Sequence, residues 1–419
     1  MSIRNHFIAG VIALAGSTVI AGPAPAAESQ AWTWCVNRNN AYSPDLAIGG
    51  CTTVIQSGKE TKGNLSIAFK NRGVARYHAH DYDRAIADAD QAIKLNPKYA
   101  SAFIDRGNSH HAKQEYNLAI ADYTEAIRID PKYAIAYKNR GDSHYAKKDY
   151  ERAFADQNIA IRLNPKYTNA YIDRGVSYYV KKDYDHAIAD YSEAIKLSPK
   201  DALAYNNRGN AYYAKSDYDR AIADYDAAIE INPMPESGSH LNVYVNRGNA
   251  YRAKKDYDRA IADYDQAIKV DPKYALAYTK RGDAYENKHD YARAAADYEI
   301  ASRLDPSDAG TWNGLCWDRA IAGQLDQALK DCNESLRLRP NDSNTIDSRG
   351  LVYLKLNELD KAIADYEAVM KLNPKTSGSL YGLGVAKNKK QAGSGDADLT
   401  AAKAMNETID KTFAEYGVK

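Results

Sequence analysis

Prolines recur along this chain at a fixed interval, and this spacing limits the possible folds more than any other feature. They lie at positions 97, 131, 165, 199 and 233, and again at 272, 306, 340 and 374. The interval is 34 residues, except for one of 39 residues between 233 and 272. Such a period is typical of solenoids, in which each repeat is a small unit that packs only on its neighbours. A division of the 419 residues into ordinary globular domains is therefore not expected.

Other residue types recur at the same interval. When each proline is assigned repeat position 32, position 20 is Ala in all nine repeats, and position 8 is Gly in all but one, where it is Cys316. Position 4 is aromatic in eight repeats, as in Phe69 and Trp312. Small residues at positions 8 and 20 predict two antiparallel helices in close contact, with the aromatic rings between repeats and the proline at the end of the second helix.

This pattern resembles the tetratricopeptide repeat, which reads aromatic, x2, Leu-Gly, x2, Tyr, then Ala, x3, Phe, then Pro. The resemblance covers residues 66 to 376 and implies an all-α solenoid, a right-handed superhelix of antiparallel helix pairs. The first helices would line a concave groove that binds ligands. The nine repeats are expected at 66–99, 100–133, 134–167, 168–201, 202–240, 241–274, 275–308, 309–342 and 343–376.

The flanking segments are predicted to cap the solenoid, whose end repeats would otherwise expose apolar faces. Residues 28–65 have the features of a degenerate helical repeat that contains one pair of cysteines. Residues 377–419 contain a partial repeat and then a helix from Asp398 to Tyr416, whose apolar residues recur at helical spacing. Residues 234–240 lengthen one repeat and are expected to form a longer loop or a hinge.

Residues 1–26 have the features of a secretory signal peptide. Arg4 precedes an apolar stretch from Phe7 to Ala21, and an A-x-A site predicts cleavage after Ala26. A membrane-spanning helix needs roughly 20 apolar residues, so retention of this shorter stretch as an anchor is the weaker interpretation. The mature chain is expected to have no membrane span and to be periplasmic or secreted.

Four cysteines form two pairs with the same spacing of 16 residues, Cys35 with Cys51 and Cys316 with Cys332. The midpoint of each pair falls on a predicted turn between two helices, which places both side chains at the same height on facing helices. Two disulfides are therefore predicted, in agreement with export to an oxidising compartment. Buried free thiols are the main alternative.

Charged residues recur at two positions of the repeat. Position 7 departs from the Leu of the family and is Arg in eight repeats, from Arg72 to Arg349, while position 23 is Asp in all nine. The two positions lie on opposite sides of the predicted turn, so a partly buried Arg–carboxylate pair is expected. One copy per repeat favours a structural role. The sequence leaves open whether each pair forms within a repeat or between neighbours.

The sequence contains no recognisable motif of an enzyme or a cofactor site. The five histidines between His78 and His144 have no fixed ligand spacing, so no metal site is predicted. Carboxylates recur with the repeat and therefore indicate turns rather than one acid–base pair. With 56 basic and 55 acidic residues, the chain has no charge excess that would favour nucleic acid.

The ligand face of the family uses first-helix positions such as 2, 5, 9, 12 and 13. Early repeats here carry aromatic rings at position 12, and the fifth and sixth carry Asn at position 9. Rings can bury the apolar side chains of an extended peptide, and Asn can bond its backbone. The alternative is that the rings pack among themselves. The predicted partner-binding residues are Tyr77, His111, Tyr145, Tyr179, Tyr213, Asn210, Asn249 and Arg252.

The function predicted from these observations is a non-enzymatic periplasmic scaffold or adaptor that binds proteins or peptides. One subgroup of the family clamps a terminal carboxylate with Lys at position 5 and Asn at position 9 of one repeat. No repeat here has both residues, which disfavours that kind of ligand. Two other functions stay open: a structural envelope module that forms homo-oligomers, and a polysaccharide-binding accessory protein, since stacked tyrosines also suit sugar rings.

Overall fold

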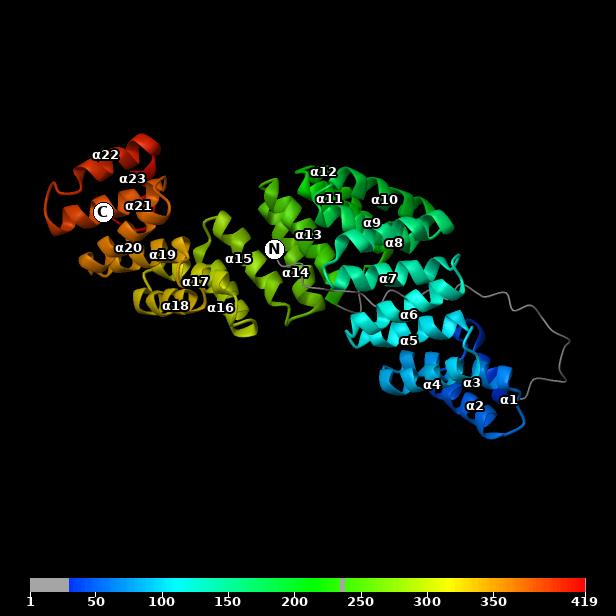
Figure 1. Cartoon of the computed structure of the whole chain (residues 1–419). Helices are drawn as coiled ribbons and strands as arrows, with labels where there is room; N and C mark the ends of the chain where they lie inside the picture. Colours follow the sequence, from blue (N-terminus) through cyan, green and yellow to red (C-terminus); the bar gives the residue numbers. More distant parts are fainter. Residues whose placement is uncertain (1–29, 234–237, 419) are drawn as a thin grey trace. The chain divides into compact units, whose positions relative to one another are not determined.

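The computed structural model of the protein describes residues 30–233 and 238–418, and these residues form helices joined by short turns (Figure 1). They contain no strand, so the prediction of an all-α fold is confirmed. The chain divides into two compact units, of which the first ends at Lys215 and the second begins at Ser216. The predicted signal segment, residues 1–26, lies outside the described residues.

The helices of each unit follow one another in sequence order. Those of the first unit are α1 (Gln30–Val36), the 3-10 turn η1 (Arg38–Asn40), α2 (Pro44–Gln56), α3 (Lys62–His78), α4 (Tyr82–Leu95), α5 (Ala100–Ala112), α6 (Tyr116–Ile129), α7 (Ala134–Ala146), α8 (Tyr150–Leu163), α9 (Thr168–Val180), α10 (Tyr184–Leu197) and α11 (Ala202–Ala214). Those of the second are α12 (Tyr218–Ile231), α13 (Gly238–Ala253), α14 (Tyr257–Val270), α15 (Ala275–Asn287), α16 (Tyr291–Leu304), α17 (Ala309–Ile321), α18 (Leu325–Leu338), α19 (Ser343–Lys355), α20 (Leu359–Leu372), α21 (Ser377–Lys390), α22 (Asp396–Met405) and α23 (Ile409–Glu415).

Within each unit, a first helix packs against the second helix of its own repeat and against the first helix of the next repeat. Thus α7 contacts α8 and also α9, and in the second unit α15 contacts α16 and also α17. The first helices of a unit therefore form one continuous face. Side chains that recur at the same repeat position are consequently neighbours on that face.

The turn between the two helices of a repeat is built from two residues with separate tasks. In the fourth repeat Lys182 has a φ of 62°, a left-handed conformation that reverses the chain direction. The eighth repeat has Gly323 at this point, with a φ of 78°. Asp183 then caps α10, because its side chain accepts a hydrogen bond from the backbone N–H of His186.

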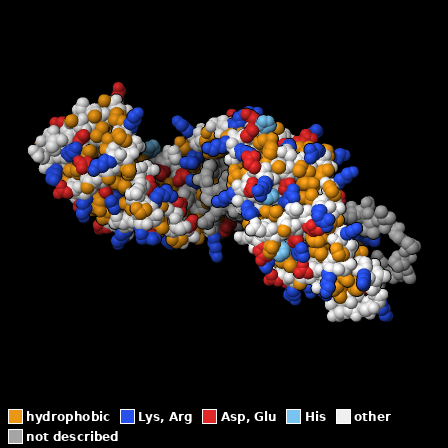
Figure 2. Space-filling model, viewed as in Figure 1, with side chains coloured by type: hydrophobic (Ala, Val, Ile, Leu, Met, Phe, Trp, Pro, Cys, Tyr) orange, Lys and Arg blue, Asp and Glu red, His pale blue; other side chains and the backbone are white. Residues whose placement is uncertain are grey.

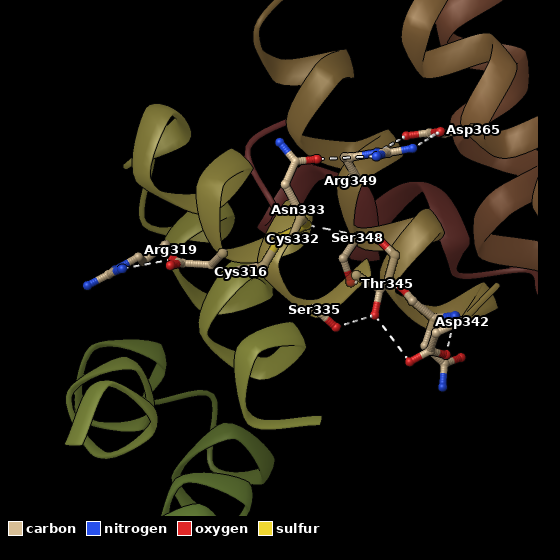
Figure 3. Close-up of a disulfide and its surroundings, with 12 residues drawn as sticks. Cys316, Arg319, Cys332, Asn333, Ser335, Asp342, Thr345, Ser348, Arg349 and Asp365 are labelled. Atoms are coloured by element: carbon tan, nitrogen blue, oxygen red, sulfur yellow. Dashed lines mark hydrogen bonds and ion pairs between the residues drawn. A yellow bond between two sulfur atoms is a disulfide. The ribbon is translucent and has the colours of Figure 1, made fainter. Parts of the chain in front are cut away.

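In several repeats a glycine at position 8 lets the helix pair approach closely, because it faces a tyrosine ring at position 24. A Cβ atom added to Gly175 would lie 2.6 Å from Cε1 of Tyr191, whose ring is buried. In the eighth repeat, a disulfide joins the two helices at these positions. Cys316 on α17 and Cys332 on α18 occupy the same two positions and form a disulfide (Figure 3).

A second disulfide joins Cys35 on α1 to Cys51 on α2, with 4.4 Å between their Cα atoms. Both predicted disulfides are therefore confirmed, and the described residues contain no free cysteine. Each bond links the two helices of one antiparallel pair, as the equal spacing of 16 residues predicted. Disulfides of this kind are typical of proteins in oxidising compartments.

The predicted Arg–carboxylate pair forms within the repeat. In the fourth repeat Nε and Nη2 of Arg174 donate to the two carboxylate oxygens of Asp190 at 2.8 and 2.6 Å. The remaining nitrogen, Nη1, donates at 2.7 Å to Asn158 of the preceding repeat. The guanidinium also lies over the ring of Tyr171, 5.7 Å from its centroid. One arginine thus connects the two helices of its own repeat and the repeat before it.

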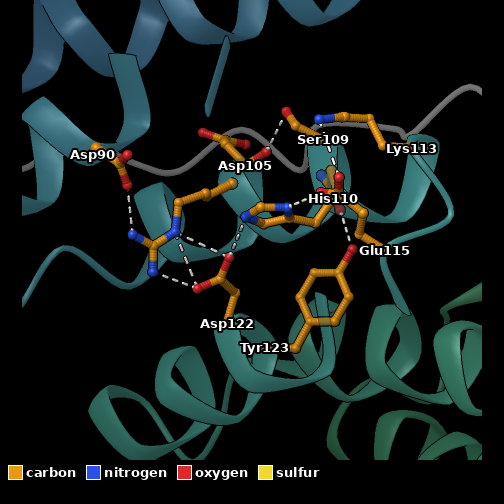
Figure 4. A network of polar contacts seen from close by, with 10 residues as sticks. Asp90, Asp105, Ser109, His110, Lys113, Glu115, Asp122 and Tyr123 are labelled. Atoms are coloured by element: carbon orange, nitrogen blue, oxygen red, sulfur yellow. Dashed lines mark hydrogen bonds and ion pairs between the residues drawn. The ribbon is translucent and has the colours of Figure 1, made fainter. Parts of the chain in front are cut away.

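Other repeats have the same connection. The guanidinium of Arg106 lies between Asp122 of its own repeat and Asp90 of the preceding one (Figure 4). The eighth repeat lacks this arginine, and Asp331 accepts instead from Arg319 at 2.8 Å (Figure 3). The further pairs are Arg72–Asp88, Arg140–Asp156, Arg247–Asp263, Arg281–Asp297 and Arg349–Asp365.

Two segments differ from the sequence prediction. Of the insertion 234–240, residues 238–240 belong to α13 rather than to a loop, and residues 234–237 lie outside the described residues. The C-terminal run forms α22 and α23 instead of one helix from Asp398 to Tyr416. At the turn between them, the Asn406 side chain accepts a hydrogen bond from the backbone N–H of Thr408 at 3.1 Å.

Candidate functional site

The five predicted aromatic side chains at position 12 lie on successive first helices of the first unit, and each is half-buried. Four of them contact a tyrosine at position 17 of their own repeat, with ring centroids between 5.2 and 5.5 Å apart. The rings are therefore held in pairs, which fixes one edge of each and leaves part of each exposed. The pairs are Tyr77–Tyr82, His111–Tyr116, Tyr145–Tyr150 and Tyr179–Tyr184.

His111 takes the place of a tyrosine in this row. Its Nδ1 lies 2.8 Å from Oγ of Ser143 in the next repeat. Burial, with a smaller effect of Lys138, lowers the pKa of His111 to about 4. Burial also raises the pKa of Tyr145 to about 12. Both rings are consequently uncharged at neutral pH, so this part of the row is an uncharged aromatic surface.

The predicted polar residues are divided between the two units. Asn210 lies on α11 of the first unit, whereas Asn249 and Arg252 lie on α13 of the second. Oδ1 of Asn249 accepts a hydrogen bond from the hydroxyl of Tyr264 at 2.9 Å, so that oxygen already supports the repeat. Arg252 points toward α15, where its Nη1 lies 3.6 Å from Oδ2 of Asp283.

A partly buried polar network lies beside the aromatic row in the first unit. Lys138 on α7 contacts Asp142 of the same helix at 2.7 Å and Asp173 of α9 at 3.4 Å. Burial, with the adjacent charge of Asp142, raises the pKa of Asp173 to about 7. Lys138 is thus already paired with two carboxyl groups. This geometry adds a reason against capture of a terminal carboxylate by Lys138.

The second unit contains a cluster of three carboxyl groups, Asp283 and Glu286 on α15 and Asp318 on α17. The hydroxyl of Tyr298 lies 3.0 Å from Oδ1 of Asp283 and 3.0 Å from Oε2 of Glu286. Asp318 is 0% exposed, and neither of its carboxyl oxygens has a hydrogen-bond partner among the described residues. Burial, reinforced by Glu286 and Asp283, raises the pKa of Asp318 to about 9. This carboxyl group is therefore protonated at neutral pH.

Sequence reasoning did not single out Asp318, although the repeat frame contains the signal. It occupies position 10, which is Ala or Ser in the first seven repeats and Val352 in the ninth. Those small residues are buried, as at Ala250 and Ala284. Asp318 could have been identified because it is an acidic residue at a repeat position that other repeats fill with small, buried residues.

Two other kinds of feature are absent from the described residues, a metal site and a membrane-spanning helix. Within residues 30–233 and 238–418, no group of His, Cys, Asp or Glu side chains is arranged to hold a metal ion. No helix in the same ranges is long and apolar enough to cross a membrane. On the face in Figure 2, basic and acidic side chains alternate, in keeping with the formal net charge of +1.

Several solved structures are similar to the chain. A tetratricopeptide repeat protein from Parabacteroides merdae has 19% sequence identity and a TM-score of 0.47, with 60% of this chain and 98% of that chain covered. PilF of Pseudomonas aeruginosa has 18% identity and a TM-score of 0.46, with 52% and 97% covered. YrrB, described as a TPR protein with an unusual peptide-binding site, has 24% identity and a TM-score of 0.37, with 45% and 95% covered. No curated protein matches the chain.

Family models match most of the repeat region. One described as TPR repeat matches residues 107–148, 177–216 and 248–289. Four described as tetratricopeptide repeat match residues 66–99, 202–235, 279–343 and 347–376. Together with the helix pairs and the recurring small, aromatic and proline positions, these matches establish that the chain belongs to the tetratricopeptide repeat family.

Proposed function

We propose that this protein is a non-enzymatic scaffold or adaptor of the bacterial periplasm that binds protein or peptide partners on its first helices. Proteins with tetratricopeptide repeats bind protein or peptide partners. The observation that carries the proposal is the row of half-buried rings on α3, α5, α7, α9 and α11, at the same position of five successive repeats. The row consists of Tyr77, His111, Tyr145, Tyr179 and Tyr213.

The physical chemistry of this row suits an extended peptide. Rings fixed along one edge lose little conformational entropy when a ligand packs on them, which is one reason why Tyr is frequent at binding hot spots. The ring pairs with position 17 supply that fixation in the first four repeats. Asn210 lies on α11, the helix that also carries Tyr213. Its side-chain amide is of a kind that can bond a peptide backbone.

The periplasmic location predicts a specific covalent state of the mature protein. Export would remove the segment before Ala27, and oxidation would give the two disulfides. The intact mass of the exported protein should therefore correspond to an N-terminus near Ala27 and to the loss of four hydrogens. Retention of the first 26 residues would contradict cleavage, and four titratable thiols in the folded protein would contradict the disulfides.

Substitution of the row tests the partner-binding role. Tyr179→Ala combined with Asn210→Ala should weaken partner binding by well over tenfold, because truncation of one hot-spot residue typically costs about 2 kcal/mol or more. Partners would first be identified by crosslinking and pull-down from the native envelope. The dissociation constant of each purified partner would then be measured with the parent and with the double variant.

Leu118→Ala provides the matched control, because Leu118 is 52% exposed on the second helix α6. It removes accessible apolar surface away from the first helices and should leave the affinity unchanged. Far-UV circular dichroism and thermal melting would establish that the double variant is folded. Lost stability with unchanged affinity would instead show that the rings only pack. If the double variant no longer formed a homo-oligomer, the row would be assigned to self-association. If it no longer bound polysaccharide, the row would be assigned to glycan binding.

A further inference from the structure

The C-terminal segment folds back onto the first helices of the second unit. After α22, which packs against α21, the chain turns at residues 406–408 and continues as the short helix α23. Ile409, Phe413 and Val418 are 4%, 6% and 7% exposed. They belong to the same apolar cluster as Leu351 and Leu354 of α19. The segment is therefore seated on the face of the first helices.

Two contacts extend this placement to α17. The ring of Tyr416 packs edge-on against Trp317, with 5.0 Å between ring centroids. The backbone carbonyl oxygen of Tyr416 accepts a hydrogen bond from Nζ of Lys355 at 2.8 Å. The same Nζ donates to the carbonyl oxygen of Ala320 at 2.6 Å. Residues 409–418 thus contact the first helices of three successive repeats, namely α17, α19 and α21.

The residues that this segment covers occupy the groove positions of their repeats. Trp317 and Leu351 are at position 9, Leu354 at position 12 and Lys355 at position 13. In the first five repeats position 9 is Val, Asn or Asp and position 12 is Tyr or His, whereas in the eighth and ninth repeats both positions are apolar. With the segment in place, Leu351 and Leu354 are 2% and 1% exposed. The chain therefore uses the ligand face of these repeats to hold a helix.

Residues 409–418 depend on their packing against α17, α19 and α21 for their helical structure. α23 has 7 residues, and an isolated helix shorter than about 12 residues is marginal in water. Local openings of such end segments require much less free energy than global unfolding. Such an opening would expose the apolar surface of the groove. The exposed surface would favour the binding of another helix with similarly spaced apolar side chains.

We propose that the groove of α17, α19 and α21 is a binding site for a short amphipathic helix of a partner protein, and that residues 409–418 occupy it in competition with that partner. The helix that fits has apolar or aromatic side chains spaced as Ile409, Phe413 and Tyr416 are, followed by a backbone carbonyl that reaches Lys355. The site is on different helices from the aromatic row of the first unit. The proposal for each site can therefore be confirmed or refuted independently of the other.

The test uses the full chain with a weakened segment. Phe413→Ala combined with Tyr416→Ala removes the two rings that contact α21 and α17. This variant should bind a fluorescent synthetic peptide of residues 406–418 at least tenfold more tightly than the parent does. In the parent the tethered segment competes at an effective concentration in the range of about 1 mM. Fluorescence anisotropy would measure both affinities.

Two controls separate groove binding from nonspecific adsorption. A peptide with alanine in place of Phe413 and Tyr416 should not bind. Leu351→Asp added to the double variant should abolish binding of the original peptide, because it places a charge in the apolar groove.

A folded double variant that fails to bind the peptide would overturn the proposal. If the double variant does not fold, Tyr416→Ala alone serves as the milder variant, because the Phe413 contacts remain. Its affinity for the peptide should exceed that of the parent, and equal affinities would overturn the proposal as well. A concentration-dependent dimer of the parent that the double substitution abolishes would identify a second copy as the occupant and would overturn the assignment to a partner protein.

Discussion

Arg174→Ala is expected to lower the free energy of unfolding by about 3 kcal/mol, as is typical when one partner of a buried ion pair is removed. The side chains of Arg174 and Asp190 are 20% and 8% exposed, and two hydrogen bonds join them. The substitution leaves the carboxylate buried without its partner and also breaks the contact with Asn158. Urea unfolding followed by circular dichroism would measure the loss. Hydrogen exchange would locate it in α8, α9 and α10.

Arg128→Ala is the matched control for this prediction. Arg128 makes the same two-nitrogen contact with a carboxylate, Glu125, but its side chain is 69% exposed. Exposed ion pairs contribute little to stability, so this variant should melt close to the parent. Asp190→Ala added to Arg174→Ala should recover part of the loss, since no unpaired carboxylate then remains. Equal melting of the Arg174→Ala and Arg128→Ala variants would contradict the structural role of the pair.

Asp318→Ala is expected to raise the stability of the second unit, by about 2 kcal/mol at neutral pH, because it removes a buried carboxyl group without a hydrogen-bond partner. An alanine fits at this position, since Ala250 and Ala284 are 0% exposed at the same position of the sixth and seventh repeats. Thermal unfolding at several pH values would measure the gain. A lower melting temperature of the variant would contradict the prediction.

The gain should depend on pH with a defined sign. The pKa of Asp318 is about 9 in the folded protein, above the ordinary value of about 4 for an unfolded chain. Below pH 4 the group is protonated in both states and has no effect through ionisation. As pH rises from about 4 to about 9, the unfolded state loses its proton first, and the parent becomes progressively less stable. Asp318→Asn, which cannot ionise, should remove this part of the pH dependence.

Features that occur once in every repeat could be predicted from the sequence. The helix pairs follow from the small residues and the proline, and an Arg–carboxylate pair follows from two positions on opposite sides of the turn, although the sequence did not decide whether the pair forms within a repeat or between neighbours. The disulfides Cys35–Cys51 and Cys316–Cys332 follow the same logic, because two residues equidistant from a turn meet on facing helices. These contacts join residues that are close in sequence. The nine repeats define the position of each residue within the helix pair, so the contacts could be placed.

The aromatic row was identified by position, but its surroundings were not. The repeat frame placed Tyr145 and Tyr179 on successive first helices, as the structure has them. It did not indicate that each ring packs on a tyrosine of the same repeat, or that Lys138 joins carboxyl groups of two helices. Those contacts depend on side-chain directions between neighbouring helices, which spacing along one helix does not define.

By itself, the sequence determined the repeat, the fold, the two disulfides and the existence of an Arg–Asp pair, because these features recur with the repeat or join residues that are close in sequence. The structure placed that pair within the repeat. Only the tertiary structure decided that the arginine also bonds to the preceding repeat, that Asp318 is buried without a partner, and that residues 409–418 return to the groove. The apolar spacing of the C-terminal run continues through the turn at Asn406, so periodicity alone predicts one straight helix. The run bends because the apolar surface of α17, α19 and α21 buries its side chains, and this free energy arises only after the repeats have stacked.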